Sequence, residues 1–460
     1  MDILILFVIL IALFHRSYFC TYVVDDTVGY KLMKRMKERG LTWGNFSYNL
    51  KHALYGAGIF RNAKQEYLFT TLLHFTICVL IYDITDSLMV SVLYMVNPVN
   101  NQTAVWLNGR RYAIGVLCCL LVWKFKILFL PLYAFAVWLH VHAIALPILI
   151  LTTKYWYLVP MGFLTFYVFG WKGLKSRHDI RKKDFAGINE LQKIRPQKLI
   201  IYVKTLGFYF FHTIFPNKPR MYHEFLYYFS RYPDDIKRGY SFNFEFFKGL
   251  AVCTFAGYEI VIQHNFWMLW WLAFISQWGN IYGVTQNAAD RYCSLAGIGL
   301  MVTLNKYILI LPTPSIAYTF FITFYILRYL PLFRAYTSID NFHYYHINIE
   351  PGAVESRTLQ ATRCLAKNDP FSAYALIKQG ILYRPQDFKL LLLMSQVLFA
   401  MKKFEPAQQI LNVAEKHVPL GDEEDCKREF EKIRTNPSMQ PPKPNRKDRR
   451  AIEAQKRNQK

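Results

Sequence analysis

Long uninterrupted runs of apolar residues constrain this chain more than any other feature of its sequence. Examples are KLIIYVKTLGFYFFHTIF (198–215), FWMLWWLAFISQWGNIYGV (266–284) and SIAYTFFITFYILRYLPLF (315–333). An α-helix rises about 1.5 Å per residue, so about 20 apolar residues cross a hydrocarbon layer about 30 Å thick. Between residues 2 and 335 we count about ten to twelve candidate spans by this criterion. The sequence therefore predicts an all-α, polytopic integral membrane protein.

The first apolar run, MDILILFVILIALFHRSYFCTYVV, resembles a signal peptide only at first sight. It lacks a basic segment before the apolar part and a small-residue cleavage site after it, and it is long enough to cross a membrane. We interpret it as an uncleaved span. His15 and Arg16 inside it are costly in lipid, so they either face protein or water or extend to the membrane interface.

The net charge of +24 is concentrated in two places, at residues 170–198 and 443–460. Basic stretches beside a membrane usually contact anionic lipid head groups. Nucleic acid is not an expected partner, because these stretches carry no interleaved aromatic residues. The eight cysteines show no spacing typical of a metal site, and we expect a structural or interfacial role for His343 and His346 rather than metal binding.

The composition changes after residue 350, where amphipathic segments replace the apolar runs. Pro385 and Pro419 lie 34 residues apart, and Ala373 and Ala407 precede them at the same offset. Thirty-four residues is the tetratricopeptide period, in which small residues lie where paired helices approach closely. Ala414 fits the pattern, while Gly380 replaces the corresponding alanine in the first copy. We predict a membrane domain at 1–345, tetratricopeptide-like repeats at 350–435 and a disordered basic tail at 436–460, with a plain helical hairpin as the alternative to the repeats.

Polar residues gather at the ends of several predicted spans. Asp25 and Asp26 follow the first span in YVVDD, and three further segments are NPVNNQTAVWLNGRRYAIG (97–115), LHVHAIALPILIL (139–151) and NAADRYCSLAGIGL (287–300). Arginine matches phosphate bidentately and stays charged near lipid. A membrane-embedded carboxylate near such arginines suits a reaction with a lipid-phosphate donor and a hydroxyl acceptor.

In the order of these segments, over roughly residues 1–420, the chain resembles the transmembrane and tetratricopeptide-repeat O-mannosyltransferases and their bacterial relatives. These proteins belong to the GT-C class of membrane glycosyltransferases. The second segment keeps five residues of the family pattern, and the fourth keeps six; they are Pro98, Val99, Trp106, Gly109 and Arg110, then Asp290, Arg291, Tyr292, Leu295, Ile298 and Gly299.

The chain also departs from the family pattern at several positions. Asn97 replaces a histidine, Tyr112 replaces an acidic residue, and Ser294 and Ala296 differ from the family. The family's Lys-Glu pair before Pro147 is replaced by His140 and Val141, and the repeat region is short. These differences concern the acceptor and the extent of activity. None of them falls on Asp25, Asp26, Arg110 or Arg291.

The resemblance implies transfer of a sugar, mannose in the animal members, from a polyprenyl- or dolichyl-phosphate donor to an acceptor hydroxyl such as a protein serine or threonine. Asp25 or Asp26 would be the catalytic base, and Arg291 with Arg110 would bind the donor phosphate. Asp290, Tyr292, Trp106, His140 and His142 would support them. The scheme needs no cofactor or metal, although some GT-C enzymes use a divalent ion. The implied location is the bacterial inner membrane or, in a eukaryotic cell, the endoplasmic reticulum.

Two other functions are open at this stage. A transporter or lipid flippase would line a pathway with intramembrane charges, but it would also show internal repeats among the spans, and we see none in the sequence. A non-catalytic scaffold would use the repeats to recruit a partner protein, yet an anchor needs neither many spans nor arginines at their ends.

Overall fold

The structure is a computed structural model, and it describes residues 1–21, 60, 62–139, 141–170, 198–219, 240–278, 289–350, 353–418 and 423–435. These residues form helices joined by turns, with no strand among them. The chain divides into two compact units, Met1–Tyr345 and His346–Lys460. Below, the first is called the bundle and the second the repeat unit. The prediction of an all-α fold is confirmed for the part of the chain described.

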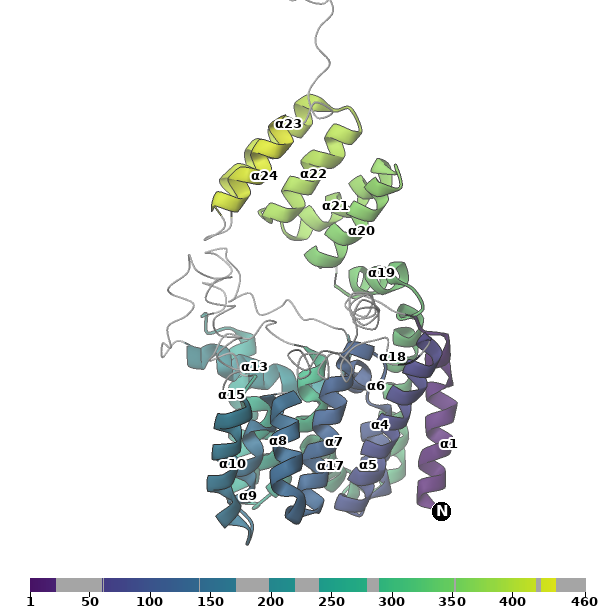
Figure 1. The fold of residues 1–460 in the computed structure, drawn as a ribbon, viewed down its shortest axis with the longest axis vertical. Coiled ribbons are helices and arrows are strands. Elements are labelled where there is room, and N and C mark those ends of the chain that lie inside the picture. Colours follow the sequence, from purple (N-terminus) through teal and green to yellow (C-terminus); the bar gives the residue numbers. More distant parts are fainter. Residues whose placement is uncertain are drawn as a thin grey trace, which may run out of the picture. The chain divides into compact units, whose positions relative to one another are not determined.

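The bundle consists mainly of helices that run roughly alongside one another (Figure 1). Short 3-10 turns connect several of them, including η1 (His15–Phe19), η3 (Pro98–Asn100), η4 (Leu107–Gly109), η6 (Val141–Ala145) and η10 (Asp290–Tyr292). The α-helices are α1 (Asp2–Phe14), α4 (Ala63–Thr85), α5 (Leu88–Val96), α6 (Asn101–Ala104), α7 (Arg110–Lys124), α8 (Phe129–Leu139), α9 (Leu146–Ile150), α10 (Val159–Thr165), α13 (Lys198–Ile214), α15 (Phe244–Val261), α16 (Phe266–Ser276), α17 (Cys293–Leu309) and α18 (Pro314–Ala335), followed by α19 (Ile339–Ile349) at the junction of the two units.

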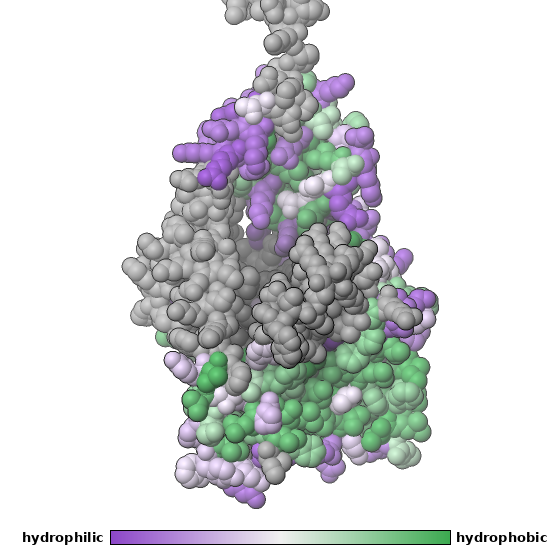
Figure 2. Space-filling model, viewed as in Figure 1, coloured by the Kyte–Doolittle hydropathy of each residue, from purple (hydrophilic) through white to green (hydrophobic). Residues whose placement is uncertain are grey.

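Four of the described helical segments are long and apolar enough to cross a membrane: Asp2–Phe19, Ala63–Thr85, Asp290–Leu309 and Pro314–Ala335. Shorter apolar helices, such as Phe266–Ser276, lie among them. Figure 2 shows a broad hydrophobic band over the visible face of the bundle, with hydrophilic residues below it. Membrane-spanning character is thus supported by four helices, and the larger predicted number of spans stays a prediction.

Helix α17 is the most enclosed of the four candidate spans. Of its apolar window 67% is buried inside the protein, against 28% for the windows of α1 and α18. Gly299 allows this close packing, because a Cβ atom there would lie 2.2 Å from the carbonyl oxygen of Trp267 on α16. The Ile-Gly pair in the sequence therefore has a packing role, and α17 carries the residues before it into the bundle interior.

Short polar side chains set where several helices begin. Asn62 accepts a hydrogen bond from the Gln65 amide at the start of α4, at 3.0 Å. Asn265 accepts from the amide of Trp267 at the start of α16, also at 3.0 Å. Asparagine at such a position satisfies amide groups that have no partner within the helix. These caps fix where the chain turns back into the bundle.

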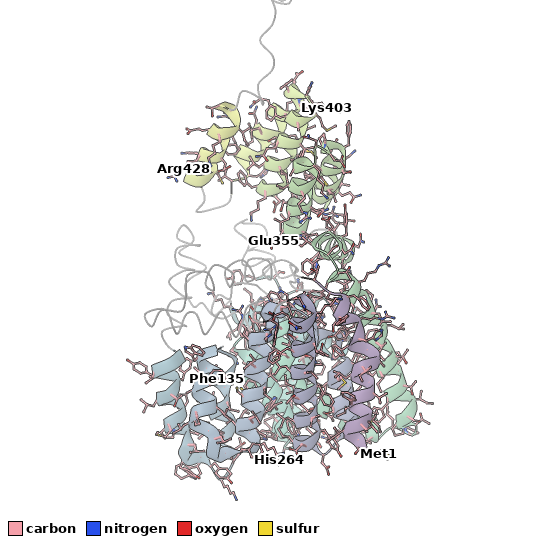
Figure 3. All side chains as sticks on the ribbon, turned by 45° about the vertical axis from the view of Figure 1, so that its right-hand side comes forward. Met1, Phe135, His264, Glu355, Lys403 and Arg428 are labelled. Atoms are coloured by element: carbon pink, nitrogen blue, oxygen red, sulfur yellow. The ribbon has the colours of Figure 1, made fainter. Side chains whose placement is uncertain are left out.

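The repeat unit is built from helix pairs of nearly constant length. Its helices are α20 (Val354–Ala366), α21 (Pro370–Tyr383), α22 (Phe388–Ala400), α23 (Phe404–Lys416) and α24 (Glu423–Thr435). Figure 1 shows them as successive antiparallel pairs, and Figure 3 labels Glu355, Lys403 and Arg428 along their course. The apolar contacts between neighbours include Ala373, Ala407 and Ala414, which are fully buried.

The helix boundaries of this unit repeat with a period of 34 residues. Helices α20 and α22 begin at Val354 and Phe388, and α21 and α23 begin at Pro370 and Phe404. The turns repeat too, since Asn368 and Lys402 both adopt left-handed backbone, with φ of 58° and 60°. The 34-residue spacing of alanines and prolines in the sequence therefore equals the spacing of the helices in the structure. Pro419 lies outside the described residues.

Candidate functional site

The structure describes most, but not all, of the residues predicted to form a site. Asp25, Asp26 and His140 lie outside the described residues. His142 lies in the short turn η6, and its side chain is not described. The remaining predicted residues can be placed relative to one another: Trp106 directly precedes η4, Arg110 begins α7, and Asp290, Arg291 and Tyr292 form η10.

The segment around Arg110 is folded tightly enough to require its glycine. A Cβ atom on Gly109 would lie 1.5 Å from the carbonyl oxygen of Gln102, which no side chain tolerates. This contact holds η4 against α6 and starts α7 at Arg110. Gly109 therefore permits the close backbone contact that places Arg110 inside the bundle.

Arg110 forms a buried ion pair with Glu66 of α4. Its Nη2 lies 2.5 Å from Glu66 Oε2, and both side chains are fully buried. Nε donates to the hydroxyl of Thr70 at 3.3 Å, whereas Nη1 is buried without a hydrogen-bond partner. Breaking such a pair is costly because the remaining charge is left in a low-dielectric interior. Arg110 thus links α7 to α4, and its Nη1 group is buried without a hydrogen-bond acceptor.

Arg291 lies at the start of α17 and is almost completely buried, with 5% exposure. Its Nε donates to the hydroxyl of Tyr112 and its Nη1 to Gln102 Oε1, both at 3.0 Å. The guanidinium also lies over the rings of Trp106 and Tyr292, at 5.8 and 5.0 Å from their centroids. Aromatic faces attract a cation and hold its plane. One distant segment of the sequence, residues 102–112, together with the adjacent Tyr292 therefore orients this side chain.

Asp290 contacts two polar side chains on other helices, His212 of α13 and Asn101 of α6. Its Oδ1 lies 2.8 Å from His212 Nε2 on α13, and its Oδ2 accepts from Asn101 Nδ2 at 3.1 Å. The carboxylate is fully buried, and the histidine ring stacks on Phe208 with 5.0 Å between ring centres. His212 was not predicted from the sequence.

A chain of hydrogen bonds leads from Asp290 to the end of the first predicted span. The hydroxyl of Tyr336 donates to Asn101 Oδ1 at 3.2 Å, and the carbonyl of Tyr336 accepts from the amide of Thr21 at 3.0 Å. The carbonyl of Thr21 accepts from the Tyr67 hydroxyl at 2.7 Å. Thr21 is the last described residue before Asp25 and Asp26.

Aromatic rings close the remaining sides of this arrangement. Tyr292 stacks face to face on Trp278, with 3.8 Å between centroids and 5° between planes. Trp106 is buried, and its indole N–H has no hydrogen-bond partner. Below, the name arginine cluster means Asn101, Gln102, Trp106, Tyr112, His212, Asp290, Arg291, Tyr292 and Tyr336.

A second buried polar group lies elsewhere in the bundle. Glu259 of α15 is fully buried and contacts the Tyr307 hydroxyl, Asn265 Nδ2 at 2.6 Å and Lys306 Nζ at 3.2 Å. His264, beside Asn265, lies at the same end of the bundle as Met1 (Figure 3). Lys306 is near the last turn of α17 and Asp290 precedes its first, about 24 Å away along a helix of this length. The Glu259 group therefore fastens the opposite end of α17.

The arginine cluster combines the parts that handling an anion inside a membrane requires. It has an oriented, buried guanidinium, neutral hydrogen-bond donors and acceptors around it, and aromatic walls that limit water. Among the described residues, no group of three histidine, cysteine, aspartate or glutamate side chains is close enough to hold a metal ion. The groups of the arginine cluster can bind an anion through arginine and can donate or accept hydrogen bonds.

Of the residues that sequence reasoning missed, one carried a usable signal. His212 lies in the apolar stretch GFYFFHTIF (207–215), and ionisable residues in such stretches commonly mark functional or buried polar sites in membrane helices. Asn101, Gln102 and Tyr336 gave no comparable signal, because amides and tyrosines near helix ends are common.

Comparisons of the chain with protein-family models, curated proteins and solved structures give no match.

Proposed function

We propose that this chain is an integral-membrane glycosyltransferase that moves a sugar from a polyprenyl- or dolichyl-phosphate donor to an acceptor hydroxyl, with inversion at the sugar carbon. In this scheme the acceptor oxygen forms a bond to the anomeric carbon, while the bond from that carbon to the phosphate oxygen breaks. The lipid phosphate leaves with the electron pair, and the hydroxyl proton passes to Asp25 or Asp26 acting as base.

The observation that carries the proposal is the set of contacts joining three separated polar segments. Gln102 and Tyr112 hold Arg291, Asn101 holds Asp290, and Tyr336 connects Asn101 to Thr21. These are the segments whose order in the sequence resembles the GT-C O-mannosyltransferases. Independent ends of helices have no general reason to converge on one buried arginine.

Chain length limits how far the acidic pair can lie from this cluster. Asp25 follows Thr21 by four residues, and a residue spans at most about 3.6 Å, so their Cα atoms are within about 14 Å of each other. Thr21 itself is bonded to Tyr336. This bound leaves room for one sugar to lie between a catalytic carboxylate at position 25 and a phosphate bound at the arginine cluster.

In the proposed complex Arg291 binds the donor phosphate and offsets the charge that develops on it as the sugar leaves. Its orientation by Tyr112 and Gln102 lowers the reorganisation needed at that moment. Arg110 contributes through Nη1, while its remaining nitrogens stay with Glu66 and Thr70. Trp106 and Tyr292 position the guanidinium and shield it from water.

The acceptor class that we propose is a protein serine or threonine, and the sugar a mannose-like hexose. Support for a protein acceptor comes from the repeat unit, whose 34-residue helix period is that of tetratricopeptide arrays. Such arrays bind extended peptides or partner proteins along stacked helices. A membrane domain of GT-C type with about ten to twelve spans is part of the same proposal.

Sugar transfer in membranes tests this proposal. Radiolabelled polyprenyl-phosphate sugar is supplied to membranes that contain the wild type, Asp25→Asn, Asp26→Asn or Arg291→Ala, with Arg334→Ala as the control. Arg334 is exposed near the end of α18 and lies outside the arginine cluster. We expect a loss of about 100-fold or more for Arg291→Ala and for at least one aspartate variant, and no loss for the control. Equal transfer in all variants at equal protein level contradicts the assignment.

A further inference from the structure

Two hydrogen-bond donors of one short segment are buried without a partner among the described residues. They are the indole N–H of Trp106 and Nη1 of Arg110, which lie on either side of the turn η4. Trp106 is 2% exposed and Arg110 is fully buried. A buried donor that forms no hydrogen bond has lost its contacts with water and gained nothing in return, so each such group calls for a physical explanation.

The surroundings of these two donors differ from those of another unpaired donor in the bundle. In the described part of the chain the indole N–H of Trp271 also has no partner, but its ring packs against Phe210 in the apolar core. Burial of so large an apolar ring offsets the loss of one hydrogen bond. The Trp106 ring instead lies beside a guanidinium, with 5.8 Å between its centroid and Arg291 Cζ, and Arg110 is itself charged.

The chemistry of the two groups restricts what can bind them. An indole N–H and an arginine N–H donate hydrogen bonds and accept none, so their ligand has to supply acceptor atoms. Glu66 offsets the charge of Arg110, and the ligand therefore need not be a strong anion. A headgroup that joins a phosphate to a sugar presents acceptor oxygens of both kinds, charged and neutral.

We propose that the Trp106 indole N–H and Arg110 Nη1 are binding groups that donate hydrogen bonds to oxygen atoms of the phosphate-sugar headgroup of the lipid donor. This inference rests on the proposed function and deepens it, because it assigns Trp106 a contact with the donor besides its contact with Arg291. It requires no free donor on Arg291. The amide of Gly109 donates to the Trp106 carbonyl at 3.0 Å and so closes the turn that separates the two binding residues.

Lipid binding by the full-length protein in detergent, measured by native mass spectrometry, tests the role of Trp106. The two probes are a polyprenyl phosphate without sugar and the same lipid carrying mannose. Trp106→Phe keeps an aromatic ring and removes the N–H, so we expect about threefold to tenfold weaker binding of the mannose-bearing lipid. An equal loss with the sugar-free lipid places the contact on the phosphate, whereas no loss with it places the contact on the sugar.

Trp271→Phe is the matched control for this variant. It removes the same kind of buried N–H and creates a similar cavity outside the arginine cluster. Both variants should change thermal stability in detergent by similar amounts, and only Trp106→Phe should weaken lipid binding. The role of Trp106 is overturned if Trp106→Phe binds both lipids as tightly as Trp271→Phe does.

The role of Arg110 is tested in a variant that leaves no buried charge without its partner. Arg110→Met combined with Glu66→Leu removes both charges of the ion pair, so the protein should keep most of its stability while Nη1 is lost. We expect about tenfold weaker binding of both lipids, because hydrogen bonds from charged groups are the stronger ones. Unchanged binding of both lipids by this double variant overturns the role of Arg110.

The behaviour of the wild type separates this inference from the proposed function. If the wild type binds the lipids and transfers sugar, and the Trp106 and Arg110 variants do the same, the inference is wrong and the proposed function is intact. If binding is weakened in these variants but no sugar is transferred, the headgroup contacts are supported and the glycosyltransferase is contradicted. A wild type that neither binds the lipids nor transfers sugar contradicts both.

Discussion

The repeat unit and the bundle are both helical, but different kinds of contact determine them. In the repeat unit the same helix boundaries, turns and small residues recur 34 residues apart, so each part is specified by its neighbours in sequence. In the bundle the decisive contacts join residues far apart, such as Gln102 with Arg291 and His212 with Asp290. The comparison indicates that periodic packing builds the one unit, while buried polar and backbone contacts define the other.

The largest effect that we expect comes from Gly109 in the bundle. Gly109→Ala places a Cβ atom 1.5 Å from the Gln102 carbonyl, so η4 and α6 must separate and Arg291 loses a partner. We expect a loss of more than about 4 kcal/mol in the free energy of unfolding. Gly115→Ala on α7 is the matched control, because a Cβ atom there has nothing within 4 Å. Thermal unfolding in detergent measures both; equal stability of the two variants would contradict the backbone role of Gly109.

A somewhat smaller effect is expected when the ion pair between Arg110 and Glu66 is broken. Removing either buried charge strands the other, so Arg110→Met or Glu66→Leu should cost about 3–5 kcal/mol, and the double variant should recover most of it. The repeat unit offers the contrasting pair, Lys432 and Glu429, at 2.6 Å on an exposed surface. Lys432→Met should have no measurable effect on stability. A similar loss from both pairs would remove the distinction between the two units.

Two aspartates that cap helices of the repeat unit, Asp369 and Asp387, should affect its stability with opposite dependence on pH. Burial raises the pKa of Asp387 above its ordinary value, whereas hydrogen bonding from Ser372 lowers the pKa of Asp369. The contribution of Asp387 to stability therefore falls as pH rises above about 3.8, and that of Asp369 is lost as pH falls below about 3.8. Relative to the wild type, we expect Asp387→Asn to stabilise the unit more at pH 7 than at pH 3. We expect Asp369→Asn to destabilise it at pH 7 but not at pH 3.

These two aspartates can be compared by hydrogen exchange of α21 and α22 amides in the full-length protein. Each variant is measured against the wild type at the same pH, so the intrinsic pH dependence of exchange cancels. Asparagine keeps an oxygen that accepts from the Leu390 or Ser372 amide, and the caps themselves should persist. If both variants respond to pH in the same direction, the opposite signs assigned to the two carboxyl groups are wrong.

The smallest effect concerns the left-handed turns of the repeat unit. Asn368 tolerates this backbone conformation, but Lys402 at the equivalent position is strained by its side chain. Lys402→Gly should therefore stabilise the unit by about 0.5–1 kcal/mol, while Asn368→Gly should change stability less. Exchange rates of the α23 amides provide the measurement. A loss of stability in Lys402→Gly would show that the turn is not strained.

The sequence predicted the all-α class and the helix period of the second unit, because both follow from local patterns of apolar, small and breaking residues. It also singled out the segments around Arg110 and Arg291, since charged residues at the ends of apolar runs are unusual. It could not identify which residues hold those arginines. Glu66 and Gln102 lie 44 and 189 residues away from their partners, and no spacing rule connects such positions.

The central claim is that the acidic pair after the first span and Arg291 belong to one site. Its most direct test is cross-linking of Asp25→Cys with Arg291→Cys in a chain whose eight native cysteines are replaced by alanine. Gln102→Cys with Arg291→Cys is the positive control, because these side chains are 3.0 Å apart. We predict that thiol reagents about as long as one sugar ring join positions 25 and 291. If only the control pair is joined by these reagents, the two groups do not share a site and the account is contradicted.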